Sequence, residues 1–164
     1  MTMNTDETGV RWHRHYYRAF RPNSKNFSGE NCREFGKRQL IPITGGTVSG
    51  AIEGYVVGGG VDSQVIDKNG ICRLSARYAV ETNDGLSFYI ENNGIRRVPA
   101  EFRDRLFGDD MSFFNDIPAD EVYFRTTPTF EVHHPGLQWL RESLFISSGE
   151  RTASGVRLSF YRVT

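Results

Sequence analysis

The segment VYFRTTPTFEVHH, residues 122–134, alternates between two kinds of side chain. One set is mostly aromatic or apolar and consists of Val122, Phe124, Thr126, Pro128 and Phe130. The other set carries an arginine and a glutamate and consists of Tyr123, Arg125, Thr127, Thr129 and Glu131. A period of two is the pattern of a β-strand, because successive side chains point to opposite faces. The segment therefore predicts a strand whose charged face either meets solvent or lines a cavity.

The same period recurs along the chain. Residues 71–82 and 86–92 alternate on either side of Asn83-Asp84-Gly85, and this strand–turn–strand pattern is the strongest local signal. Pro42 makes the extended run that contains it an edge or an irregular entry to a sheet. Further strands are predicted at residues 12–20, 37–46, 50–60, 61–67, 143–151 and 154–163.

One segment has the pattern of a helix. Residues 99–107 begin with a proline and place Phe102 and Leu106 on one side. Residues 1–12 are polar and are expected to form a flexible tail, and residues 13–164 show no domain boundary. About eight strands at regular spacing, with one short helix, predict an all-β chain that forms a single antiparallel barrel or sandwich.

The faces of these strands leave two interpretations open. In residues 71–82 an apolar set with Leu74 and Val80 alternates with a set that contains Arg77 and Glu81. Such second faces carry Tyr, Arg, Ser, Thr and Glu rather than lysines, as in a barrel of about eight strands whose lumen holds one small ligand. Alternatively, the apolar faces fill the barrel and the charged faces are solvated.

Composition narrows the classes of function. The 164 residues suit one domain, and 20 basic against 20 acidic residues give a net charge of zero. A balanced chain has no overall field to attract nucleic acid or an acidic membrane surface. No apolar run approaches the roughly 20 residues of a membrane span, and the polar N-terminus lacks the apolar region of a signal peptide. Two cysteines suit a reducing compartment, so we expect a cytoplasmic protein.

Four charged residues lie within strand-like or glycine-rich segments: Asp62, Arg77, Arg125 and Glu131. A buried charge needs a partner, and an arginine–carboxylate pair can also hold a substrate carboxylate, enolate or phenol. A carboxylate beside an apolar pocket can act as a general acid or base. The alternative interpretation of such a pair is a structural salt bridge.

Metal and nucleotide chemistry find little support. The neighbours His133 and His134 would point to opposite faces of a strand, and no Cys, His or carboxylate cluster has zinc-ligand spacing. The glycine-rich segments 43–50 and 58–60 contain neither GxGxxG between a strand and a helix nor a phosphate-binding loop that ends in GKS or GKT. We therefore expect no metal and no cofactor.

Six segments in this order resemble the bacterial and fungal family catalogued as domain of unknown function 3237: IPITGGTVSG, GGGVD, ARYAVETNDGLSFYIENNGIR, VYFRTTPTFE, WLRESLFISSGER and GVRLSFYRV. The resemblance covers about residues 14–163. It implies an antiparallel β-barrel of the calycin or allene-oxide-cyclase type, with an internal cavity. It also implies self-association, so a homodimer or larger homo-oligomer is expected.

The polar residues that match the family's segments are Asp62 in GGGVD, Arg77 and Tyr78 in ARY, Tyr123 and Arg125 in YFRT, Glu131 in FE, and Trp139. Arg77 and Tyr78 point to opposite sides of their strand. Ser63 departs from the family pattern, which usually has a bulky aromatic residue after the aspartate. The resemblance favours the interpretation in which the charged faces line the lumen.

These residues predict a cofactor-independent enzyme, an isomerase, cyclase or lyase such as a dehydratase. Its substrate would be a small hydrophobic, aromatic or enolisable metabolite of the kind found in natural-product biosynthesis. Asp62 or Glu131 would move a proton, and Arg77 or Arg125 would stabilise an oxyanion. The pocket would be shaped by Tyr78, Tyr89, Tyr123 and Trp139. The alternative is a barrel that binds a small molecule without catalysis, as a lipocalin does.

Overall fold

The computed structural model describes residues 10–15 by their backbone, and residues 36–108, 110, 112–151 and 155–164 in full. The strands are β1 (Val10–His15), β2 (Lys37–Ile43), β3 (Gly45–Ser49), β4 (Gly54–Val56), β5 (Gly60–Ile66), β6 (Ile71–Thr82), β7 (Ser87–Arg97), β8 (Tyr123–Val132), β9 (Phe145–Arg151) and β10 (Gly155–Arg162). The helices are short 3₁₀ turns: η1 (Ala100–Phe102), η2 (Asp104–Phe107), η3 (Ser112–Asp116), η4 (Ala119–Glu121) and η5 (Pro135–Leu140).

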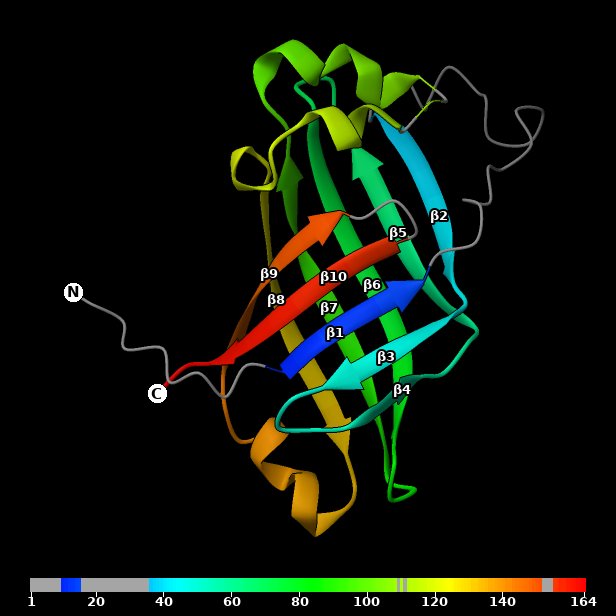
Figure 1. The fold of residues 1–164 in the computed structure, drawn as a ribbon, viewed down its shortest axis with the longest axis vertical. Helices are drawn as coiled ribbons and strands as arrows, with labels where there is room; N and C mark the ends of the chain where they lie inside the picture. The colour runs from blue at the N-terminus through cyan, green and yellow to red at the C-terminus, as the bar shows by residue number, and fades with distance from the viewer. Residues whose placement is uncertain (1–9, 16–35, 109, 111, 152–154) are drawn as a thin grey trace.

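All the strands belong to one antiparallel sheet that curls into a barrel (Figure 1). Hydrogen-bonded neighbours run from β6 through β4, β3, β1, β10, β9 and β8 to β7, and β7 pairs with β6 again. Beside β6, β4 occupies the end near Thr82, whereas β5 occupies the other end. β2 pairs with β5 and, within the described ranges, its other side has no strand neighbour. The strands therefore form a ring at one end, and the barrel has a free edge at the other.

The predicted all-β class is confirmed, as is the hairpin of β6 and β7, whose turn contains Gly85 at a φ of +83°. β2 contains Pro42 and is the edge strand, as its proline predicts. β1 begins at Val10, three residues before the predicted start of the domain. Residues 1–9 of the expected tail lie outside the described ranges.

The single helix predicted over residues 99–107 is not continuous. Two 3₁₀ turns, η1 and η2, replace it, closed by hydrogen bonds from Arg103 N to Ala100 O and from Leu106 N to Arg103 O. Short 3₁₀ turns are frequent in connections between longer elements. Among the described residues, no helix is long and apolar enough to cross a membrane.

Two apolar clusters fill the barrel from its two ends. The larger cluster is closed by η5 and contains inward residues of most strands, among them Val48, Val56, Tyr78, Val80, Phe88, Ile90, Leu140, Phe145, Leu158 and Phe160. The smaller cluster lies under η1–η4 at the opposite end and consists of Ile66, Cys72, Val98, Leu106, Phe113, Phe114 and Ile117. The apolar faces of the strands therefore point inward.

The interpretation in which the charged strand faces line the lumen is wrong. Arg77, Arg125 and Glu131 are exposed on the outside of the barrel. The 3₁₀ turns cap the ends of the barrel rather than its outer wall (Figure 1). No element of the described ranges covers the outer wall, so inward apolar faces gain burial, whereas inward arginine and glutamate would lose hydration.

Truncation of the larger cluster should cost stability. Leu158 is fully buried, so Leu158→Ala should lower the free energy of unfolding by about 2–5 kcal/mol. The matched control Leu144→Ala removes a side chain that is 78% exposed and should stay within about 0.5 kcal/mol. Urea unfolding measures both changes. Equal effects of the two variants would contradict the placement of the Leu158 side chain inside the barrel.

Candidate functional site

Between the two apolar clusters the inner face of the barrel becomes polar. This polar layer consists of the buried residues Gln39, Asp62, Gln64, Asn92, Arg96, Thr126 and Ser147. Strand register sets it in rows: Asp62, Ala76 and Asn92 lie side by side, and Gln39, Gln64, Leu74 and Gly94 form the next row. Cys72, Arg96 and Phe124 form the row nearest to η1–η4, which we call the cap. One side of the barrel interior thus carries a band of polar groups.

The amide of Gln64 joins a carboxylate to a guanidinium. Its Nε2 donates to Asp62 Oδ2 at 2.8 Å, and Arg96 Nη2 donates to its Oε1 at 3.2 Å. Cys72 Sγ also donates to that Oε1, at 3.4 Å. Asp62 and Arg96 are therefore linked through one neutral side chain instead of forming a direct ion pair.

Arg96 is a buried cation, only 3% exposed. Its guanidinium carbon lies 5.1 Å from the ring centre of Phe114 and 5.9 Å from that of Phe124. Among the described residues, its Nε has no hydrogen-bond partner and no carboxylate forms an ion pair with it. Because a buried charge normally has a paired counter-charge, this arrangement is costly for the folded chain unless another molecule completes it.

The Cys72 thiol does not supply the missing negative charge. Arg96 Nη2 approaches its Sγ at 3.6 Å. Burial nevertheless raises the pKa of Cys72, and the smaller opposing effect of Arg96 does not reverse this. Cys72 is therefore a neutral thiol at neutral pH.

Asn92 is the second incomplete group. Its side chain is fully buried, and neither Oδ1 nor Nδ2 has a hydrogen-bond partner in the described part of the chain. It lies in the same row as Asp62, with only the small Ala76 between them. Thr126 and Ser147, by contrast, satisfy each other through a hydroxyl–hydroxyl hydrogen bond.

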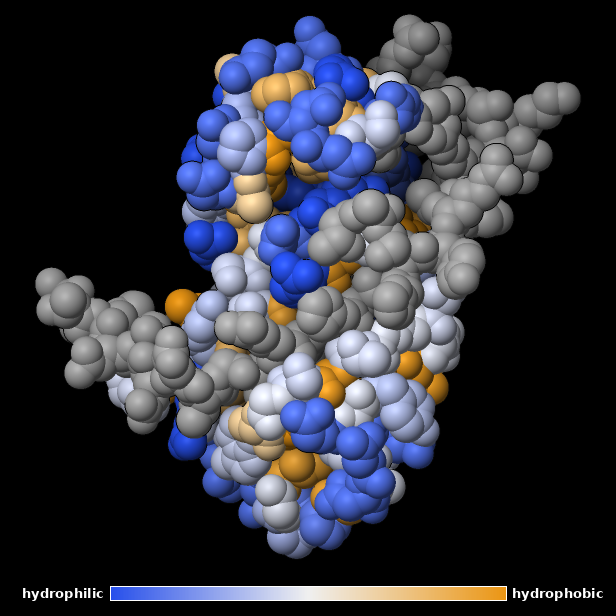
Figure 2. Space-filling model, viewed as in Figure 1, coloured by the Kyte–Doolittle hydropathy of each residue, from blue (hydrophilic) through white to orange (hydrophobic). Residues whose placement is uncertain are grey.

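A recess in the surface lies beside Phe114, one of the two aromatic residues that contact Arg96. Its volume is about 240 Å³, and its walls come from the cap and from β9: Phe114, Asn115, Ile117, Ala119, Val122, Glu150 and Arg151. Figure 2 shows the surface hollowed between the cap and the end of β9, with strongly hydrophilic residues in the hollow. Arg151 lies 4.9 Å from the Phe114 ring centre, and Arg96 also contacts this ring. Phe114 therefore contacts both the recess and Arg96.

The structure does not gather the predicted site residues. Asp62 lies in the polar layer, and Tyr78 is buried in the larger apolar cluster next to it. Trp139 lies on η5 at the far end, with its ring centre 5.9 Å from that of Phe145. Tyr89 is opposite Glu131 in the register of β7 and β8, on the outward face.

Arg77 forms a surface ion pair with Glu91, at 3.4 Å between Nε and Oε1. Since both side chains are more than one-third exposed, this is the structural salt bridge of the alternative interpretation, and it contributes little stability.

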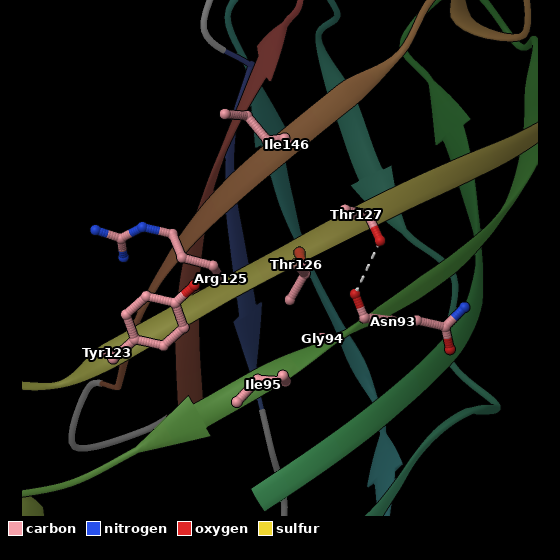
Figure 3. Close-up of a pocket in the computed structure, with 8 residues that line it drawn as sticks. All are labelled: Asn93, Gly94, Ile95, Tyr123, Arg125, Thr126, Thr127 and Ile146. Atoms are coloured by element: carbon pink, nitrogen blue, oxygen red, sulfur yellow. Dashed lines mark hydrogen bonds between the residues drawn. The ribbon is translucent and has the colours of Figure 1, made fainter. Parts of the chain in front are cut away.

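Tyr123 and Arg125 share an outer groove of about 420 Å³ (Figure 3). The Arg125 guanidinium carbon lies 5.5 Å from the Tyr123 ring centre, and its Nη1 donates to Phe124 O. The remaining walls are Asn93, Gly94, Ile95, Thr126, Thr127 and Ile146. No carboxylate lines this groove, so its lining offers no acid–base pair.

Sequence reasoning missed Gln64, Asn92 and Arg96. The strand predicted over residues 86–92 stops before Asn93-Gly94, a pair typical of turns, whereas β7 continues through it to Arg97. The alternation that places Phe88 and Ile90 inside continues to Asn92 and Arg96, and this was the available signal. Among the described residues, no three His, Cys, Asp or Glu side chains gather to hold a metal ion.

Replacing the orphaned amide should stabilise the fold. Asn92→Leu keeps the approximate shape and removes two unsatisfied buried atoms, so the free energy of unfolding should rise by about 1–3 kcal/mol. Asn93→Leu, on the exposed face of the same strand, is the matched control and should change it little. Urea unfolding decides between them. A loss of stability in Asn92→Leu would mean that the amide makes an essential bond.

The Cys72 thiol should titrate late. In a Cys32→Ser background, the rate of alkylation by iodoacetamide should reach half its maximum above pH 9.0, the ordinary pKa of the group. Because the folded chain keeps this proton longer than the unfolded chain, Cys72 should also make stability fall as pH rises through the alkaline range. A midpoint at or below the ordinary value would show that Arg96 dominates over burial.

Comparison with known proteins gives the family. A family model described as a protein of unknown function, DUF3237, matches residues 20–163. A UPF0311 protein of Clostridium acetobutylicum is 42% identical over 130 residues, which cover 79% of each chain. A UPF0311 protein of Rhodopseudomonas palustris is 43% identical over 131 residues, covering 78% of this chain and 81% of the relative.

Solved structures of similar proteins have the same fold. A protein of unknown function from Clostridium acetobutylicum superimposes with a TM-score of 0.81 at 36% identity, covering 100% of this chain and 99% of the other. A beta-barrel like protein from Acinetobacter baumannii gives 0.76 at 25% identity, covering 100% and 98%. An enzyme from Penicillium herquei gives 0.62 at 15% identity, covering 94% and 90%, and shares the fold. The chain therefore belongs to the DUF3237 family.

Proposed function

We propose that this chain binds a small aromatic or enolisable molecule against the polar layer and moves a proton on it without a cofactor. The observation that carries the proposal is the buried pair of Asp62 and Arg96, held on one inner face by Gln64. A carboxylate and a guanidinium that do not neutralise each other directly can act on the two ends of one reacting group.

The step balances within the substrate. The Asp62 carboxylate takes a proton from a carbon beside a carbonyl group, and the electron pair of the broken C–H bond forms a carbon–carbon double bond. The carbonyl electron pair moves onto oxygen, where Arg96 stabilises the enolate. In a substrate whose enolate is conjugated with a further double bond, return of the proton from Asp62 to the far carbon gives an isomer. In a substrate with a hydroxyl group on the β-carbon, the enolate expels hydroxide, which takes the proton from Asp62 and leaves as water. Both outcomes restore the Asp62 carboxylate and leave the oxidation level unchanged.

The surroundings suit such a molecule. Phe114 and Phe124 flank Arg96 with aromatic rings, and a surface recess lies beside Phe114. Aromatic walls with few polar groups are typical of small-molecule sites. Such walls exclude water, which lowers the local dielectric constant and strengthens the attraction between the Arg96 cation and a negatively charged reacting oxygen.

The second candidate is a barrel that binds the same class of molecule without converting it. Asp62 favours this candidate in one respect, since its Oδ2 already accepts a hydrogen bond from Gln64 at 2.8 Å. A carboxylate used only to fix Gln64, and through it Arg96, would organise a binding site with no proton to move.

Hydrogen exchange separates the candidates without knowledge of the substrate. A panel of aromatic ketones and β-keto acids is incubated with the full chain in D₂O, and NMR follows deuterium entering the α-carbon. The enzyme should accelerate exchange for at least one compound, and Asp62→Asn should reduce that rate by about 10²–10⁴-fold. Glu131→Gln, an outer carboxylate, is the matched control and should keep the wild-type rate.

Binding is followed in the same samples by ¹H–¹⁵N shifts of polar-layer residues. If these signals shift but deuterium exchange is no faster than in buffer alone, the enzyme candidate is wrong and the binding barrel takes its place. No shifts with any compound would contradict both candidates.

A further inference from the structure

We infer that the molecule bound in the polar layer is an aromatic carboxylate with a second oxygen at its far end, its carboxylate meeting Arg96 and its far oxygen meeting Asn92. The inference rests on the proposed function, because it names the class of molecule that enters the same site. The oxygen that Arg96 stabilises in the proposed step is then an oxygen of this carboxylate. It is carried by two groups that the described residues leave incomplete, one charged and one neutral.

The charged group calls for an anion. A guanidinium has five N–H donors, and the hydrogen bonds of Arg96 to the described residues all leave from Nη2. Its Nε is buried and has no acceptor among those residues. A charged carboxylate oxygen can accept from Nε–H, so a ligand carboxylate would supply both the missing acceptor and the missing charge.

The groups beside Arg96 do not take that role themselves. Gln64 is neutral, and Cys72 is a protonated thiol because its burial raises its pKa. Asp62 meets Arg96 through the Gln64 amide and not directly. Phe114 and Phe124 supply ring faces beside the guanidinium, as the apolar body of an aromatic acid requires.

The neutral group sets the far end of the ligand. Asn92 offers a donor and an acceptor with no partner in the described ranges, and a hydroxyl or carbonyl oxygen can use one of them. It lies four residues from Arg96 on β7, about 13 Å along the strand. After the two side chains have reached inward, this spacing suits a molecule of one ring.

Three matched probes test the class: 4-hydroxybenzoate, its neutral amide 4-hydroxybenzamide, and benzoate, which lacks the far hydroxyl. Calorimetry on the full chain at pH 7 should find the hydroxy acid at least about tenfold tighter than the amide, the usual effect of a charged hydrogen bond. Benzoate should be weaker than the hydroxy acid.

The variants assign the two ends. Arg96→Gln should remove the preference for acid over amide, and Asn92→Leu should remove the preference for 4-hydroxybenzoate over benzoate. The matched controls Arg77→Gln and Asn93→Leu should change neither preference, because both residues face outward. If Arg96→Gln does not fold, the acid–amide comparison in the wild-type protein decides alone.

Two results would overturn the inference, and they differ. Equal binding of acid and amide, with polar-layer shifts in NMR spectra, would refute the carboxylate and leave the proposed function standing. Absence of binding by all three probes, together with no response to the ketone panel, would remove the site itself.

Discussion

The candidate site depends on one constraint, the cost of holding the Arg96 guanidinium away from water inside a β-barrel. An isolated buried charge costs several kcal/mol, and the chain meets only part of that cost itself. Gln64 and Cys72 interact with one nitrogen, and Phe114 and Phe124 place ring faces beside the cation. What the described residues do not provide is a directly paired anion. A group kept in this state is more readily explained by a ligand than by stability.

The two apolar clusters contribute the stability that offsets the cost of burying the polar layer. The larger one is closed by η5 and the smaller one by the 3₁₀ turns of the cap, so the barrel is held together above and below the polar rows. The free edge at β2 and the recess beside Phe114 lie toward the cap end. Stability and binding are therefore assigned to different levels of one continuous sheet, and substitutions such as Leu158→Ala and Asn92→Leu are expected to move stability in opposite directions.

The sequence predicted the fold better than the site. The period of two identified β6, the first half of β7, β8 and β10, and their apolar faces, because that pattern is local. It could not show which of two faces closes into the interior, since this depends on what covers the outer wall, and nothing among the described residues does. Arg77 and Arg96 look alike in the sequence, yet Arg77 ends on the surface beside Glu91 and Arg96 inside. The Asn93-Gly94 pair hid the difference, because it resembles a turn while β7 runs through it.

Of the predicted site residues, Asp62 is the one that shares the polar layer with the groups proposed to bind a ligand, and its catalytic role stays a prediction. Self-association and the cytoplasmic location also stay predictions. The most direct measurement is hydrogen exchange at arginine Nε–H groups, followed by ¹⁵N NMR with assignment through single arginine variants. The account predicts a slowly exchanging Arg96 signal that moves when 4-hydroxybenzoate is added, beside a fast Arg77 signal. An Arg96 signal that exchanges as fast as that of Arg77, and ignores the acid, would contradict a buried cation that awaits an anionic ligand.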